Sequence, residues 1–157
     1  MPKPLDANQL MEFAARALSA RALSIGEMRE KLKRRAAKQG DVDDVLKRLK
    51  TAGFLDDQRF AESYAGWRRD DGGYGKARVF RDLMTRRVAP EIAKKASEKA
   101  FQEVDEIAMI EQFVKRKCKS VKNLASAYRK LRMAGFSSGN SLRVLKMDET
   151  IAEDDPI

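Results

Sequence analysis

The sequence predicts an all-α protein, built as an elongated, curved array of three tandem three-helix repeats. Apolar residues recur at the three- and four-residue spacing of amphipathic helices, and no segment alternates as a strand would. The segments LKRRAAKQGDVDDVL, FRDLMTRRVAPEIA and YRKLRMAGFSSGNSL share one plan: an apolar and basic helix, a break, then another helix. Taking Gly40, Arg87 and Gly135 as equivalent points gives a period of 47 and then 48 residues. A three-helix unit of this length cannot bury its apolar faces alone, so we expect the units to stack.

The first predicted repeat spans residues 1–54. It begins with a loose segment ending at Leu5, and the helical period starts at Asp6. Ser24 and Glu27 have the spacing of a capping box, which starts the second helix. We expect that helix to run to about residue 38, before the glycine at position 40 ends it.

A third helix then follows, for which Asp41 is the expected cap. Gly53 stops it, because glycine takes the left-handed conformation at little cost.

The second predicted repeat spans residues 55–102. Asp56 caps its first helix, with Leu55 and Phe60 at the positions of a hydrophobic staple. Phe60, Tyr64 and Trp67 form an aromatic stripe, which we interpret as core and not as a platform for stacking bases.

The third predicted repeat spans residues 103–147, with one apolar stripe through Val114 and Cys118 and a helix stop at Gly135. Cys118 is interpreted as a small core residue. Residues 148–157 contain five acidic residues and no basic one, which predicts an acidic disordered tail.

The segment GFLDDQRFAESY, followed about ten residues later by GYG, resembles the signature of the RecX family, small bacterial regulators of the RecA recombinase. The resemblance extends from about Ala15 to Met147, with Arg87 at a position where the family usually has glycine. It implies three tandem three-helix repeats. It also implies a modulator, usually an inhibitor, that lies along the groove of the RecA–DNA filament and interferes with ATP hydrolysis and strand exchange.

The charge pattern predicts a polyanionic or acidic partner. The net charge is +9, and residues 115–147 contain ten basic residues and no acidic one. A face that serves only solubility normally mixes both signs. The candidate residues for binding DNA or a nucleoprotein fall into two groups. The first surrounds the glycine turn of the second repeat and contains Arg68, Arg69, Tyr74, Lys76 and Arg78. The second lies in the third repeat and contains Lys115, Arg116, Lys119, Lys122, Arg129 and Lys130.

Catalysis has little support in the sequence. Without histidine there is no His-based triad or imidazole metal site, and no Walker-type loop is present. Paired aspartates such as Asp56-Asp57 fall at helix ends, where Asp caps the backbone. We therefore predict no enzyme activity, no catalytic residue, no metal and no cofactor, and a metal-dependent nuclease is the disfavoured alternative.

The expected setting is cytoplasmic, because the chain has a single cysteine, no secretory signal and no apolar run long enough to span a membrane. The expected partner is the RecA filament, with weak direct binding to single- or double-stranded DNA, by a monomer with no membrane association. A second hypothesis is a helical module that binds DNA directly, without RecA. The sequence does not give the direction of regulation.

Overall fold

The computed structural model describes residues 2–119 and 123–147. Within these ranges every named secondary-structure element is an α-helix. The helices are α1 (Ala7–Ala20), α2 (Ile25–Arg35), α3 (Gly40–Thr51), α4 (Asp57–Asp70), α5 (Lys76–Thr85), α6 (Pro90–Ala100), α7 (Glu106–Lys117), α8 (Leu124–Met133) and α9 (Ser138–Met147).

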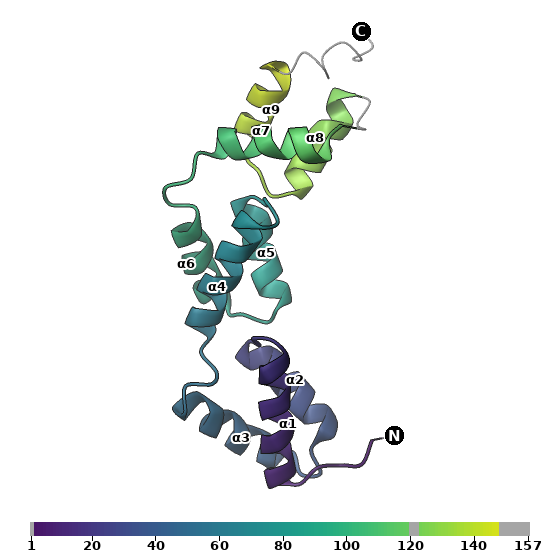
Figure 1. The fold of residues 1–157 in the computed structure, drawn as a ribbon, viewed down its shortest axis with the longest axis vertical. Helices are drawn as coiled ribbons and strands as arrows, with labels where there is room; N and C mark the ends of the chain where they lie inside the picture. The colour runs from purple at the N-terminus through teal and green to yellow at the C-terminus, as the bar shows by residue number, and fades with distance from the viewer. Residues whose placement is uncertain (1, 120–122, 148–157) are drawn as a thin grey trace.

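The helices pack in three groups of three, each around its own core. The extensive helix–helix packing lies within α1–α3, within α4–α6 and within α7–α9. Figure 1 shows the three groups following one another along the long axis of the molecule. The predicted all-α array of three-helix units is confirmed. We keep 1–54, 55–102 and 103–147 as proposed repeat boundaries; the predicted tail, 148–157, lies outside the described residues.

Each core is built from the apolar stripes of its three helices. Leu10, Leu32 and Leu49 come from α1, α2 and α3 and are almost completely buried in the first core. Val79 and Leu83 of α5 occupy the second core. The third core includes Cys118, which is buried as expected for a small core residue.

The first helix of every group begins in the same way. Asp6, Asp56 and Asp105 are the N-caps of α1, α4 and α7. Their carboxylates accept hydrogen bonds from the backbone N–H three residues later, at 2.9, 3.1 and 3.2 Å. The predicted cap at Asp56 is therefore confirmed. The staple predicted beside it is not seen in the packing, since Leu55 lies in the first core and Phe60 in the second.

The start of the chain and the end of α2 differ from the prediction. The Leu5 N–H donates to the Arg35 carbonyl at 2.7 Å, and the Ala37 N–H donates to the Leu5 carbonyl at 2.9 Å. This bridge holds Ala36 in an extended conformation, so α2 ends at Arg35 and not near residue 38. Leu5 is held in place, whereas the sequence predicted a loose segment.

The residues taken as equivalent break points also need correction. Gly40 begins α3 and has no positive φ, and the N-cap there is Gln39, so Asp41 lies in the first turn and is not the cap. Arg87 (φ 63°) and Gly135 (φ 95°) do occupy equivalent positions after α5 and α8. In both, the next N–H reaches back to the carbonyl five residues earlier, which is a Schellman motif.

Candidate partner-binding surfaces

The middle helices of consecutive groups meet end to end. At the second junction, between the second and third groups, the N-terminus of α5 faces the C-terminus of α8. The Gly75 N–H donates to the Ala134 carbonyl at 2.8 Å, and the Ala77 N–H donates to the Gly135 carbonyl at 3.3 Å. Free N–H groups at one helix end thus satisfy free carbonyls at the other, with the two helix dipoles aligned favourably.

Three residues predicted to bind a partner meet beside this junction. The Tyr74 ring lies between the guanidinium groups of Arg68, at 4.2 Å, and Arg78, at 4.9 Å. The carboxylate of Asp82 accepts from Arg68 at 2.7 Å and from Arg78 at 3.1 Å. Arg78 also donates to the Met133 carbonyl at the end of α8. Of these contacts, the bond from Arg78 to Met133 joins the second group to the third, so the cluster is tied to the junction through Arg78.

The other two residues of that predicted group lie apart from the cluster. Lys76 is exposed at the start of α5. Arg69 pairs with Asp70 at 2.7 Å and donates to the Ala100 carbonyl. The hydrogen bond to Asp70 raises the pKa of the Arg69 guanidinium, so Arg69 stays charged.

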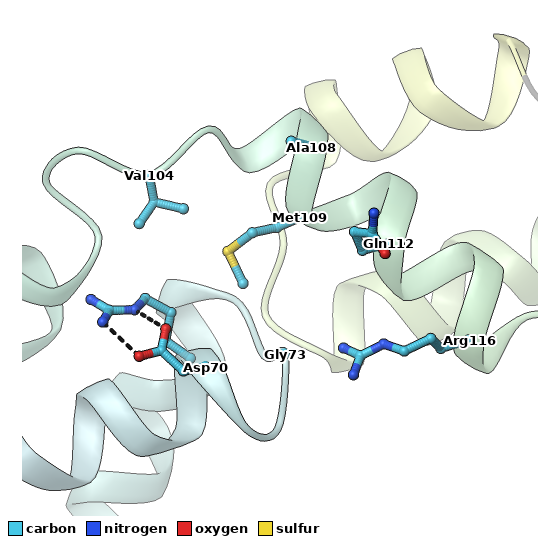
Figure 2. A pocket seen from close by; sticks show the side chains of 8 residues that line it. Asp70, Gly73, Val104, Ala108, Met109, Gln112 and Arg116 are labelled. Atoms are coloured by element: carbon cyan, nitrogen blue, oxygen red, sulfur yellow. Dashed lines mark hydrogen bonds and ion pairs between the residues drawn. The ribbon is translucent and has the colours of Figure 1, made fainter.

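Arg69 lines a cavity of about 440 Å³ between the second and third groups. Figure 2 shows Met109, Gln112 and Arg116 along α7, with Asp70 and Gly73 on the opposite wall. The Arg116 guanidinium fills the space where a side chain at Gly73 would project. The cavity is therefore lined by both Arg69 and Arg116, one from each predicted group.

Four of the remaining predicted residues of the third group lie on α7, just after it or on α8. Lys115, Lys119, Arg129 and Lys130 are exposed. Arg129 donates to the Ser126 hydroxyl at 3.2 Å, and the Lys130 ammonium donates to the Lys117 carbonyl. Lys122 lies outside the described residues.

The first junction, between the first and second groups, uses side chains. The Ser24 hydroxyl caps α2 and donates to the Arg86 carbonyl at the end of α5, at 2.5 Å. Asp57 accepts from the Ile25 N–H at 2.8 Å. Glu27 pairs with Arg21 at 3.1 Å and with Arg86 at 3.4 Å.

Two carboxylates of the first junction have shifted pKa values, in opposite directions. Burial alone would raise the pKa of Glu27, but hydrogen bonds from Arg21, the Ser24 N–H and Arg86 outweigh it and lower that pKa. Burial raises the pKa of Asp57, and the hydrogen bond from Ile25 offsets this only in part. A hydrogen bond to Tyr64 and the pairing with Glu27 raise the pKa of the Arg86 guanidinium.

The aromatic stripe lies in the core only in part, because Phe60 belongs to the second core and Tyr64 packs against it, whereas Trp67 does not. Phe60 is buried, but Trp67 is 53% exposed. The fully buried positions of α4 are Ala61 and Ala65, and α4 packs most extensively on α6. Because small residues let α4 approach α6 closely, Ala61 and Ala65 occupy the contact between these two helices. The larger rings of α4 lie beside that contact and line a cavity.

A second cavity, of about 320 Å³, opens where the end of α1 faces α4. It is lined by Arg21, Ala22, Phe60, Ser63, Tyr64, Trp67 and Arg86. Arg21 and Arg86 were not among the residues predicted from the sequence to bind a partner. The small residues at positions 61 and 65, four apart, were the signal that the aromatic stripe faces elsewhere.

Residues 2–119 and 123–147 contain neither a candidate membrane span nor a candidate metal-binding cluster. No helix there combines the length and apolar character needed to cross a bilayer. Nor do three or more His, Cys, Asp or Glu side chains gather there in a group that could hold a metal ion.

Comparison with known proteins points to one family. Residues 56–96 match a family model described as RecX, second three-helix domain. Regulatory protein RecX of Ralstonia pickettii is 30% identical over 156 residues, which is 98% of this chain and 97% of that protein. Regulatory protein RecX of Trichlorobacter lovleyi is 28% identical and is matched over 78% of this chain and 80% of its own length.

Solved structures give the same fold. The crystal structure of RecX from Lactobacillus salivarius has a TM-score of 0.69 at 18% identity, covering 92% of this chain and 97% of that one. A second structure, of regulatory protein RecX, has a TM-score of 0.63 at 17% identity and covers 90% of this chain and 74% of its own.

Proposed function

The chain belongs to the RecX family, and we propose that it regulates the RecA recombinase by binding the RecA–DNA filament. The family resemblance supplies the partner and the sense of the effect, which is inhibition of ATP hydrolysis and strand exchange. In this proposal the protein acts as a cytoplasmic monomer without catalytic activity of its own.

The observation that carries the proposal is the elongated array with exposed basic side chains on its third group. Residues 115–147 contain ten basic residues and no acidic one, and Lys115, Lys119, Arg129 and Lys130 are exposed. An extended positive body can follow the groove of a filament, where DNA phosphates and acidic protein loops are both within reach.

The two junctions support this proposal mechanically. Hydrogen bonds join α2 to α5 and α5 to α8, so the three groups are held in one relative arrangement. Binding a long groove with a preset shape avoids the entropy cost of ordering three free units. The cluster of Arg68, Tyr74 and Arg78 then contributes chiefly by fixing that shape.

The test is RecA's DNA-dependent ATPase with wild-type protein and with the double variant Arg129→Glu and Lys130→Glu. Both residues are exposed, so we expect the variant to fold and to inhibit less. The matched control is Lys94→Glu with Lys95→Glu, an exposed basic pair on α6, which should inhibit as the wild type does. Unchanged inhibition by a folded Arg129→Glu, Lys130→Glu protein would remove this surface from the interface.

Direct DNA binding without RecA is the second candidate, favoured by the acid-free segment. If the basic residues meet phosphates, each lost contact lowers the slope of log K against log salt by about one unit. We expect the double variant to lose more RecA inhibition than affinity for bare single strands at matched salt. A larger loss of affinity for bare single strands than of RecA inhibition would favour the direct DNA-binding module.

A further inference from the structure

The cavity at the first junction combines aromatic rings with cationic groups. Phe60 and Tyr64 stack with ring centroids 5.8 Å apart, and Trp67 lies 5.9 Å beyond Tyr64 at an angle of 59°. Exposure of the rings increases from the buried Phe60 to the exposed Trp67, so the Trp67 ring is accessible to a ligand. A row of rings that runs from the core to solvent offers a stacking surface at its outer end.

The rim of this cavity is positively charged. Arg21 and Arg86 line it, and their side chains are 48% and 40% exposed. Both guanidinium groups share the one carboxylate of Glu27, so the three groups together retain a positive charge. The Arg68 guanidinium lies 5.7 Å from the Trp67 ring but is paired with Asp82, so the positive charge of the rim comes from Arg21 and Arg86.

We propose that this cavity binds one unstacked nucleobase of a single-stranded nucleic acid, with Trp67 stacking on the base and Arg21 and Arg86 binding the adjacent phosphates. Stacking on aromatic rings beside a basic track is how single strands are bound without sequence preference. The cavity, about 320 Å³, lies within the range of small-ligand pockets. The positive rim favours a phosphate-bearing ligand over an apolar protein side chain.

The equivalent cavity at the second junction provides an internal comparison. The N-caps Asp56 and Asp105 set the register of α4 and α7, and in this register Phe60 corresponds to Met109 and Trp67 to Arg116. The described lining of the cavity at the second junction contains no aromatic ring, and its Asp70 is paired with Arg69. Base stacking is therefore assigned to the first junction only.

Trp67 is the single tryptophan of the chain, so its fluorescence reports on the site directly. The probe is a 15-nucleotide oligothymidylate, with an abasic strand of the same length as the control for phosphate binding. We expect the oligothymidylate to quench Trp67 emission and the abasic strand to leave it unchanged. No RecA is present, so this result does not depend on the function proposed above.

Variants complete the test, with affinity measured by anisotropy of a labelled strand. Trp67→Ala should weaken oligothymidylate binding about 5- to 150-fold, while Trp67→Phe retains most of it. Met109→Ala, in the equivalent cavity, should leave it unchanged. Equal quenching by the abasic strand, or wild-type affinity of a folded Trp67→Ala protein, would overturn the proposal.

Discussion

The two junctions join equivalent helix ends with different chemical groups. At the second junction, backbone N–H groups at the start of α5 bond directly to carbonyls at the end of α8. At the first, the Ser24 side chain and the Asp57 carboxylate make the corresponding links. Direct contact between the two backbones requires that no side chain project between the helix ends. The N-cap of α5 is accordingly Gly75, because a Cβ there would lie 2.6 Å from the Gly135 carbonyl carbon.

The comparison shows that one repeat geometry can be held in two ways. Neither junction has room for added volume, since a Cβ at Gly26 of the first would lie 2.6 Å from Arg87 Cβ and a Cβ at Gly75 of the second would lie 2.6 Å from the Gly135 carbonyl carbon. The backbones of the helix ends bond directly at the second junction. The first junction depends instead on a hydroxyl and on ionised groups, so it is also sensitive to deletion of these groups and to pH. Four predictions follow from this difference, in order of decreasing effect.

Gly135→Ala should have the largest effect. Its φ is 95°, and a Cβ there would overlap the Arg78 backbone nitrogen and lie 2.5 Å from Arg78 Cβ. Backbone strain and overpacking each cost about 1–3 kcal/mol, so we expect about 3 kcal/mol in urea unfolding. The control is Gly53→Ala, where φ is 80° but nothing lies within 4 Å, so only about 1–2 kcal/mol is expected. Equal costs would mean that the second junction is not closely packed.

Ser24→Ala should rank second. It removes an N-cap, which costs about 1 kcal/mol, and the hydrogen bond to the Arg86 carbonyl, which costs about 1 kcal/mol more. Asp105→Ala serves as the control, because Asp105 caps α7 by accepting from the Ala108 N–H of its own group. The difference between the two unfolding free energies measures the link; no difference would show that it contributes nothing.

Asp82→Asn should cost about 1 kcal/mol, because the charge shared by Arg68 and Arg78 is lost while the amide still accepts a hydrogen bond. The two cations then repel, so added salt should recover part of the loss in thermal unfolding. Glu62→Gln, which removes the exposed pair with Lys99, should change stability less. If Asp82→Asn lost the same amount of thermal stability at all salt concentrations, the electrostatic explanation would be contradicted.

The smallest effect is on the pH dependence of the first junction. The pKa of Glu27 is lowered from 4.5, so its stabilisation is complete above about pH 4.5 and is lost as pH falls through the folded-state pKa. The pKa of Asp57 is raised from 3.8, so its contribution has the opposite sign and declines as pH rises from 3.8 through the raised value. The two partly cancel in the wild type.

Single variants should separate these two contributions. Asp57→Asn should lose stability more steeply on acidification than the wild type, and Glu27→Gln less steeply. Urea midpoints between about pH 3 and pH 7 provide the measurement. Parallel profiles for all three proteins would contradict the assigned shifts.

Helix positions and most caps could be predicted from the sequence because they depend on neighbours in the chain. The Asp56 cap and the Ser24–Glu27 capping box each join residues three apart, and apolar periodicity marks the buried faces of α5 and α7. The misplaced end of α2 is the counterexample. It is set by Leu5, some thirty residues away, and no local pattern announces that bridge.

The candidate residues show the same division. Composition and charge runs were sufficient to identify the basic residues of the third group as exposed candidates. Tertiary packing decided the partners of Arg68 and Arg78, the cavity that Arg69 and Arg116 both line, and the exposure of Trp67. The sequence by itself determined the helices and their charge, because these follow from contacts within one turn. Only the tertiary structure decided which side chains are used at the junctions, because links such as that between Ser24 and Arg86 span 62 residues and form only when whole groups stack.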